Sequence, residues 1–281
     1  MAGLSTKAIK NRIKSMTSTR QITKAMELVA ASKLRNAQQK ADAVKEYFDT
    51  FYETMQDIAA SSTDFESKFI GATEDKKPLY IVIAGDRGLA GGYNSNIFRM
   101  CIGIPNDAVV APIGKRSVEY FKKRNFNILE ESYNEAAILQ TEDCYSLANI
   151  IAEGFLAGTY DSVYIIYTNF INLLRQEPER VQLLPLTLEP KEGPQTQKAI
   201  YEPGSDVLFN QIVPEYLGGI IFAALCKAIA SEQASRRQAM NSATKNADEI
   251  IADLDLQYNR ARQGAITQEI TEIVAGSNAQ S

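Results

Sequence analysis

The sequence predicts an α/β fold with long helices: an antiparallel coiled coil of N- and C-terminal helices, with an α/β domain inserted between them. No proline or glycine occurs from Leu4 to Ile70, which predicts one uninterrupted helix at that end. Further along, short apolar runs alternate with helical stretches, and helical periodicity returns from Ser205 onward. We therefore divide the chain into a first helix (1–70), a central α/β domain (75–200) and a last helix (205–281).

The first segment has the spacing of a coiled-coil seam. Apolar or small residues recur at alternating gaps of three and four at Leu34, Ala37, Ala41, Val44, Phe48, Phe51, Met55 and Ile58. Upstream, Ile22, Met26 and Val29 repeat the pattern, but the step from Val29 to Leu34 breaks its phase. Such a break changes the local winding of a supercoil. A single helix from Leu4 to Ser61 would be about 85 Å long.

The last segment has a similar pattern with smaller side chains. Pro214 and the pair Gly218-Gly219 mark its early part as kinked or as a helix start. A narrow stripe follows at Met240, Ala243, Ala247, Ile250, Leu254 and Ala261. Because the two periodic segments stand at opposite chain ends, they can pair in antiparallel fashion. Periodicity alone leaves open an ordinary bundle of long helices.

The central segment is predicted to consist of alternating strands and helices. Leu79–Ala84 is a continuous apolar run, as expected of a strand buried on both faces. Further strands are predicted at Ala108–Ala111, Ser162–Tyr167 and Arg180–Leu188, and helices at Lys115–Arg124 and Glu142–Ala157. Pro185 places the last strand at an edge. This alternation predicts a largely parallel sheet.

Composition excludes several functional classes. The net charge is −4, so no global basic field favours nucleic acid. The sequence has no histidine, which excludes Ser-His and Cys-His nucleophile pairs. Its three cysteines form no C-x-x-C pair, as expected in a reducing compartment. The apolar run Leu217–Cys226 is shorter than the ~20 residues that span a bilayer. We therefore expect membrane contact only through partners.

Two segments suggest binding sites. Gly85–Asn94 is a glycine-rich turn of the kind that can cradle phosphate, but its spacing matches no nucleotide-binding motif. The alternative is a tight strand-to-helix turn in which Asp86 and Arg87 make charged hydrogen bonds. The first forty residues carry nine basic side chains and one acid, Glu27. Such a helix suits nucleic acid, anionic lipid or an acidic protein surface, or it is a solvated face. Few aromatics and an acidic whole chain favour a specific partner over nucleic acid.

Four carboxylates near the C-terminus, Asp248, Glu249, Asp253 and Asp255, invite a metal-site interpretation. Their helical spacing places them mainly on the outer face beside the apolar stripe. No histidine or glycine-bearing calcium loop accompanies them. We interpret them as a solvated helix face and predict no metal site.

Three motifs resemble those of one known family. Ile22–Lys33, with the sequence ITKAMELVAASK, is similar to the N-terminal signature of ATP synthase γ subunits. Asp86–Asn94, DRGLAGGYN, resembles the family's central motif, and Arg262–Gly276, RQGAITQEITEIVAG, resembles its C-terminal signature. The three occur in the family's order and span nearly the whole chain. Ala90 stands where many members have cysteine, and Gly264 where alanine is more usual.

The resemblance implies a bacterial rotor shaft. The coiled coil would enter a ring of three αβ subunit pairs, and a Rossmann-like α/β domain would contact the ε subunit and the membrane ring of c subunits. Ion flow through that ring would drive the shaft, which couples rotation to ATP synthesis or hydrolysis on β. The chain itself would be non-catalytic, without cofactor or metal, and peripheral at the cytoplasmic face of the cell membrane.

The resemblance also implies which residues contact β. Met26 matches a position near the lever loops of β. Arg262, Gln263, Thr267 and Glu269 match positions that hydrogen-bond a catch loop on β. Because glycine costs a helix about 1 kcal/mol relative to alanine, Gly264 is expected to loosen the shaft beside these contacts.

Overall fold

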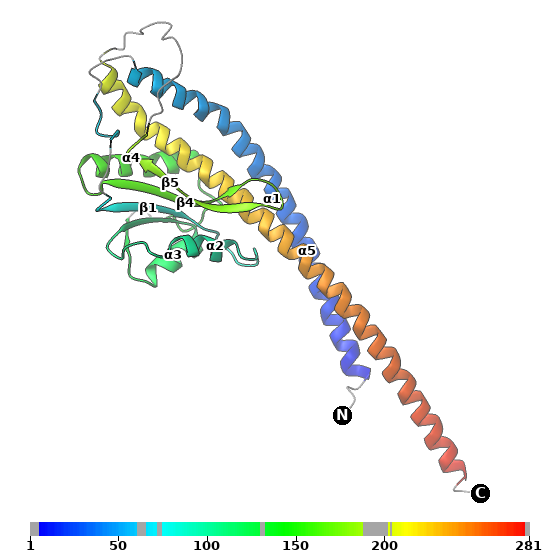
Figure 1. The fold of residues 1–281 in the computed structure, drawn as a ribbon. Coiled ribbons are helices and arrows are strands. Elements are labelled where there is room, and N and C mark those ends of the chain that lie inside the picture. The colour runs from blue at the N-terminus through cyan, green and yellow to red at the C-terminus, as the bar shows by residue number, and fades with distance from the viewer. Residues whose placement is uncertain are drawn as a thin grey trace. The chain divides into compact units, whose positions relative to one another are not determined.

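The computed structural model describes residues 6–60, 66–71, 75–129, 133–187, 202 and 204–278. Two long helices, α1 (Thr6–Ala60) and α5 (Ser205–Asn278), stand at the two ends of the chain (Figure 1). The chain forms two compact units, one of Met1–Ala30 with Arg236–Ser281 and one of Ala31–Ser235. Each long helix therefore contributes to both units. The predicted fold class, α/β with two long terminal helices, is confirmed.

The sheet lies in the larger unit and has the strand order β3-β2-β1-β4-β5. Its strands are β1 (Pro78–Ile83), β2 (Val109–Ile113), β3 (Asn127–Ile128), β4 (Ser162–Phe170) and β5 (Gln176–Leu184). β1 is parallel to β2 and β4, and β3 is parallel to β2, whereas β5 is antiparallel to β4. The largely parallel, Rossmann-like sheet is thus confirmed, with β5 at its edge.

Side chains of β1 enter two apolar clusters because successive strand residues point to opposite faces. Leu79, Ile81 and Ile83 pack with residues of α4 (Thr141–Leu156) and of the first part of α5. Tyr80, Val82 and Ala84 pack with residues of α2 (Tyr93–Met100) and α3 (Lys115–Lys122). The sheet therefore lies between two helix layers, which explains why β1 is apolar at consecutive positions.

Within the larger unit the two long helices run antiparallel. Phe51 and Tyr52 of α1 stack on Tyr216 of α5, with ring centroids 6.4 and 6.0 Å apart. Earlier on α1, Leu34 and Ala37 share an apolar cluster with residues 230 and 234, which lie later on α5. Residue numbers therefore increase along α1 in the direction in which they decrease along α5, which is the antiparallel pairing that the sequence predicts.

The last strand was predicted with the wrong bounds: it begins at Gln176, before the predicted Arg180, and ends at Leu184, while Leu188 lies outside the described residues. A tight turn causes the early start, because the Asn172 side-chain oxygen accepts the backbone N–H groups of Leu174 and Arg175, each at 2.9 Å. The strand continues directly from this turn. β3, of two residues, was not predicted. The first helix was predicted over 1–70, but α1 ends at Ala60, and Ile70 instead forms a β-bridge with Leu186. The other predicted strands and helices agree within three residues.

Pro214 and the Gly218-Gly219 pair do not mark the start of a helix, because α5 begins at Ser205 and runs through them. A proline inside a helix costs about 3 kcal/mol. Burial offsets that cost, since Phe209, Val213 and Leu217 follow one another at helical spacing and are all buried in the core.

One stretch of α5 is long and apolar enough to cross a membrane by length and composition alone. However, 61% of that stretch is buried inside the protein, as in a core helix.

Candidate functional site

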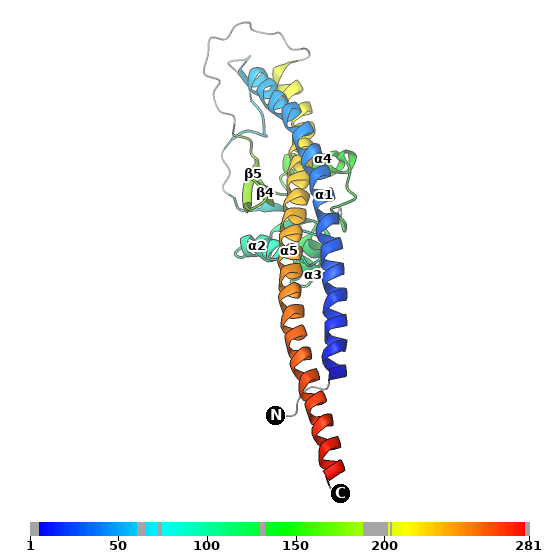
Figure 2. The same ribbon diagram turned by 90° about the vertical axis from the view of Figure 1, so that its right-hand side faces the viewer.

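The smaller unit contains the predicted site residues and consists of two antiparallel helix segments that lie side by side in both views (Figures 1 and 2). Two side-chain pairs fix how they meet. The Arg20 guanidinium lies 3.1 Å from the Asp248 carboxylate, and the Thr23 and Thr244 hydroxyl oxygens are 2.8 Å apart.

Burial along α1 corrects the predicted seam. Ile22 and Val29, which we expected to face the partner helix, are 58% and 56% exposed. Thr23 and Ala30, one residue later in each case, are buried. One residue is about 100° around a helix, so the true seam lies on a neighbouring face.

The corrected seam has no phase break. Counting back from Leu34, alternating gaps of four and three give Ala30, Glu27, Thr23, Arg20, Met16, Ile13 and Ile9. Apart from Arg20, each of these is buried or half-buried. The prediction failed because polar residues hold three consecutive seam positions.

The stripe on α5 is shifted in a similar way at one position. Met240, Ala247 and Leu254 are buried as predicted, but Ile250 is 44% exposed and Ile251 is half-buried in its place. The four carboxylates beside the stripe are exposed, as we predicted. Within the described ranges, no group of three or more histidine, cysteine, aspartate or glutamate residues is placed to hold a metal ion.

The apolar residues that are not in the α1 seam form an outward strip. Ile22, Met26 and Val29 recur at helical spacing, and Met26 is half-buried between its two exposed neighbours. We call these three residues the α1 stripe. A continuous exposed apolar strip on a basic helix is typical of a surface that binds another protein.

The end of α5 extends beyond its pairing with α1. Thr6 lies seventeen residues before Thr23, and Ala261 lies seventeen after Thr244, so antiparallel geometry puts Thr6 and Ala261 at one level. Ala261 is half-buried, and every residue from Arg262 to Ala275 is exposed. We call residues 262–275 the α5 tip.

One face of the α5 tip combines apolar and polar side chains. Its exposed apolar residues are Ile266, Ile270, Ile273 and Val274. At 100° per residue, the four predicted contact residues Arg262, Gln263, Thr267 and Glu269 fall with them on an arc of about 160°. We did not predict this apolar stripe from the sequence, although its helical spacing is visible in the C-terminal motif.

The five predicted contact residues do not form one site. By the same antiparallel counting, Met26 is level with residue 241, which is 21 residues before Arg262. That separation is about 31 Å along a helix. The smaller unit therefore offers two contact areas, the α1 stripe and the α5 tip.

The glycine-rich turn in the larger unit is closed by the protein's own groups. Asp86 accepts the backbone N–H groups of Lys115, Ala136 and Ala137 at 2.9–3.1 Å. The Asn94 side chain accepts the N–H of Gly85, and a Cβ on Gly85 would lie 2.8 Å from the Glu232 carboxyl group. With two carboxylates at this turn, a phosphate would meet repulsion, which favours the structural alternative for this motif.

Known proteins resemble the chain over nearly its full length. A family model described as ATP synthase matches residues 5–280. The ATP synthase gamma chain of Ruminococcus albus is 42% identical, over 96% of this chain and 97% of the relative. That of Acetobacterium woodii, named "ATP synthase gamma chain, sodium ion specific", is 38% identical over 96% and 97%.

Two solved structures share the fold. A chain of the Euglena gracilis mitochondrial ATP synthase (OSCP/F1/c-ring, rotational state 3) aligns with a TM-score of 0.68 at 17% identity, covering 98% of this chain and 94% of that one. A chain of the Tetrahymena thermophila mitochondrial ATP synthase central stalk/c-ring aligns with a TM-score of 0.58 at 21% identity, covering 79% and 99%.

Proposed function

Because the chain belongs to the ATP synthase gamma-chain family, we propose that it is the central rotor shaft of a bacterial F-type ATP synthase. It couples ion flow through a membrane ring to the conformational cycle of the catalytic β subunits, for ATP synthesis or hydrolysis. The α5 tip carries this proposal. It is an exposed helix end with an apolar stripe bordered by polar side chains, and an apolar centre with a polar rim is the usual anatomy of a protein interface.

The partners follow from the same role. A ring of three αβ pairs surrounds the α5 tip and the α1 stripe, while the α/β domain meets the ε subunit and the ring of c subunits. Membrane contact runs through these partners, so the chain is peripheral at the cytoplasmic face of the cell membrane. The solved structures that share its fold come from F1 and c-ring assemblies.

Each polar residue of the tip has a definite capacity for contact with β. The Arg262 guanidinium has five N–H donors and suits a carboxylate or several carbonyl groups. The Thr267 hydroxyl donates to the Gln263 backbone carbonyl at 2.9 Å, so it presents lone pairs to a donor on the partner. Glu269 is an acceptor when ionised. Met26 adds an apolar contact lower on the shaft.

Torque then arises from differential contact. A single shaft is asymmetric, whereas the ring has three similar αβ pairs, so each β subunit meets a different side of the tip at any moment. A conformational change is driven only by unequal interaction with two states. The chain works without catalytic residues or a cofactor of its own, in keeping with a histidine-free sequence and a glycine-rich turn closed by Asp86.

Reconstitution tests this function. α and β subunits from the same source are mixed with and without the chain, and ATP hydrolysis and native mass are measured. We expect one copy per three αβ pairs and faster sustained hydrolysis. A sound αβ ring that does not bind the chain would contradict the shaft assignment.

A second set of variants tests the tip. Replacing Arg262, Gln263, Thr267 and Glu269 by alanine removes several charged hydrogen bonds, each worth ~1.5–3 kcal/mol, so ATP-driven ion pumping is expected to fall at least about tenfold. The matched control replaces Gln268 and Glu272, which pair with each other at 2.9 Å on the other half of the helix. Both variants are expected to melt like the unmodified chain, because these positions are exposed. Full pumping by the fourfold variant would refute the proposed contacts.

A further inference from the structure

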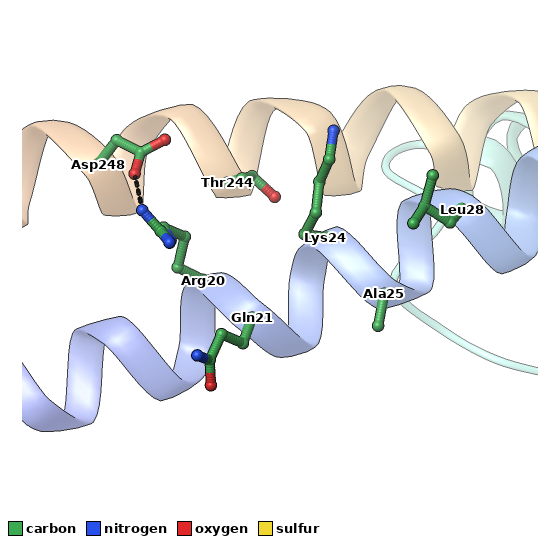
Figure 3. Close-up of a pocket in the computed structure, with 7 residues that line it drawn as sticks. All are labelled: Arg20, Gln21, Lys24, Ala25, Leu28, Thr244 and Asp248. Carbon is green, nitrogen blue, oxygen red and sulfur yellow. Dashed lines mark hydrogen bonds and ion pairs between the residues drawn. The ribbon is translucent and has the colours of Figure 1, made fainter.

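We propose that a polar layer in the smaller unit sets the register of α1 against α5, and so the height of the α5 tip above the α1 stripe. The layer comprises Arg20, Thr23 and Glu27 on α1 and Thr244 and Asp248 on α5. Figure 3 shows three of these residues, Arg20, Thr244 and Asp248. Three consecutive seam positions of α1 are polar here. A polar residue at a coiled-coil core position specifies register at a cost in stability.

The two threonines form the directional part of the layer. Thr23 is buried, its hydroxyl lies 2.8 Å from that of Thr244, and each hydroxyl also reaches a carbonyl of its own helix, Arg20 at 3.0 Å or Met240 at 2.8 Å. A hydroxyl has one proton. One threonine therefore donates across to the other, which donates to its own backbone, and both oxygens are satisfied in this register.

The alanine positions of the seam in the smaller unit discriminate poorly between registers. Ala30 on α1 and Ala243, Ala247 and Ala261 on α5 are small and similar, and apolar burial has no direction. A slip of one heptad would bring Ile251 or Arg237 to the place of Thr244. Ile251 offers no hydrogen-bond partner to a buried hydroxyl, and Arg237 would push a guanidinium against the seam.

The ion pair contributes less to the choice of register. Arg20 and Asp248 have side chains that are 45% and 53% exposed, and exposed pairs are weak. The slip that brings Ile251 to Thr23 also brings Asp255 to Arg20, so the ion pair would re-form. Glu27 is satisfied within α1 by Lys24 at 3.1 Å. Within the smaller unit the threonine pair is therefore the discriminating element, and its register agrees with the one in which Leu34 and Ala37 cluster with residues 234 and 230 in the larger unit.

Register determines where the contact areas stand. A one-heptad slip moves one helix by about 10 Å along the other, and the α5 tip by the same distance relative to Met26. The threonines are thus positioning residues for contacts they do not make. This consequence for coupling rests on the proposed function, whereas the register itself does not.

Disulfide trapping in the full-length chain tests the register. Met16 lies seven residues before Thr23 and Ile251 seven after Thr244, so Met16→Cys with Ile251→Cys reports the native register. Met16→Cys with Tyr258→Cys reports a slip of one heptad. The native cysteines can stay, because burial raises the thiol pKa of Cys101 and Cys144 to about 12 and of Cys226 to about 11, which leaves them protonated at pH 8.

The decisive variant is Thr23→Val with Thr244→Val, which keeps side-chain shape and removes both hydroxyls. We expect the slipped cross-link to rise about tenfold relative to the unmodified pair, the factor that corresponds to one ordinary hydrogen bond, while the melting temperature stays the same or rises. Thr23→Ser with Thr244→Ser retains the hydroxyls and is expected to keep the native cross-link. If the two threonines only stabilised the helix pair, the valine variant would lower the melting temperature as well as change the cross-linking yield.

Two results would overturn the proposal: equal cross-linking in the valine and unmodified chains, or serine variants that slip like the valine variants. Coupling is then measured in the assembled enzyme as ions pumped per ATP hydrolysed. Slipped valine chains that still pump fully would refute the positioning role and leave the register role standing. Failure of every chain, the unmodified one included, to join an αβ ring would instead refute the proposed function.

Discussion

Gly264→Ala is expected to stiffen the α5 tip by a predictable amount. Gly264 lies inside α5, and a Cβ at this position would meet no atom within 4 Å. The substitution therefore changes helix propensity without new packing, which favours alanine by about 1 kcal/mol. That energy corresponds to a factor of about five in an equilibrium at 25 °C. Because the tip is exposed, its opening is local, and amide protection over residues 262–275 is expected to rise about fivefold.

Hydrogen exchange of the full-length chain, followed by mass spectrometry of peptides from the tip, measures this change. Ala265→Gly is the matched control, because it introduces the same backbone freedom at the next exposed position and is expected to lower protection by a similar factor. Peptides from β1 and α4 report the larger unit and are expected to stay unchanged. An unchanged tip in Gly264→Ala, or equal gains in all peptides, would refute the argument that the tip opens as an independent helix end.

Three other perturbations probe the larger unit. Gly218→Ala would place a Cβ 2.3 Å from the Tyr145 ring. Although alanine has the better helix propensity, this clash is expected to lower the free energy of unfolding in urea by about 1–3 kcal/mol. A variant more stable than the unmodified chain would contradict this packing. Asp86→Ala removes a carboxylate that accepts three backbone N–H groups and is expected to cost about 3 kcal/mol or more, with a neutral result arguing against that network. In the folded chain, burial raises the pKa of the three cysteine thiols from 9.0 to about 11–12. As the pH rises, the thiols of the unfolded chain therefore lose their protons before those of the folded chain. Stability is therefore expected to fall as pH rises above about 9, and flat unfolding curves from pH 9 to 11 would refute this linkage.

Secondary structure was predicted correctly from the sequence where one residue pattern continues through most of a segment. β1 is apolar at consecutive positions because helices cover both faces of the sheet, and most of the long segment without proline and glycine is a single helix, which ends at Ala60. The boundaries of β5 were harder, because half-exposed edge residues such as Glu177 and Glu179 give no apolar signal. β3, of two residues, is too short for any periodicity to show. Strand order depends on which crossovers pack, and local sequence does not encode that.

The helix through Pro214 shows how tertiary burial overrides a local rule. Proline and paired glycine are correct signals of a weak helix, and they would break an isolated one. In this protein the buried face that includes Phe209, Val213 and Leu217 holds the helix together. A sequence gives the local cost directly, but the compensating burial becomes visible only when the packing partner is known.

The seam error has a more specific cause, which bears on function. We assigned apolar residues to the interior, and on α1 this placed Ile22 and Val29 inside although they are exposed. Extending the strict heptad from Leu34 backward would have reached Thr23 and shown that the interior is polar there. Sequences tend to depart from local rules at functional sites. Here the departure both releases an apolar strip for a partner and places a hydrogen bond in the seam.

Both departures weaken the smaller unit for the same reason. A coiled coil is most stable when apolar side chains fill its seam along its whole length. This helix pair gives up apolar contact at Arg20, Thr23 and Glu27, and among the described residues its seam ends before the α5 tip. Its apolar side chains remain exposed at the α1 stripe and the α5 tip, where they stabilise nothing within the described chain. Partners that cover these side chains would supply the missing burial, so the isolated chain is expected to melt below the assembled one. The helix pair is therefore built to be completed by the ring that we propose surrounds it.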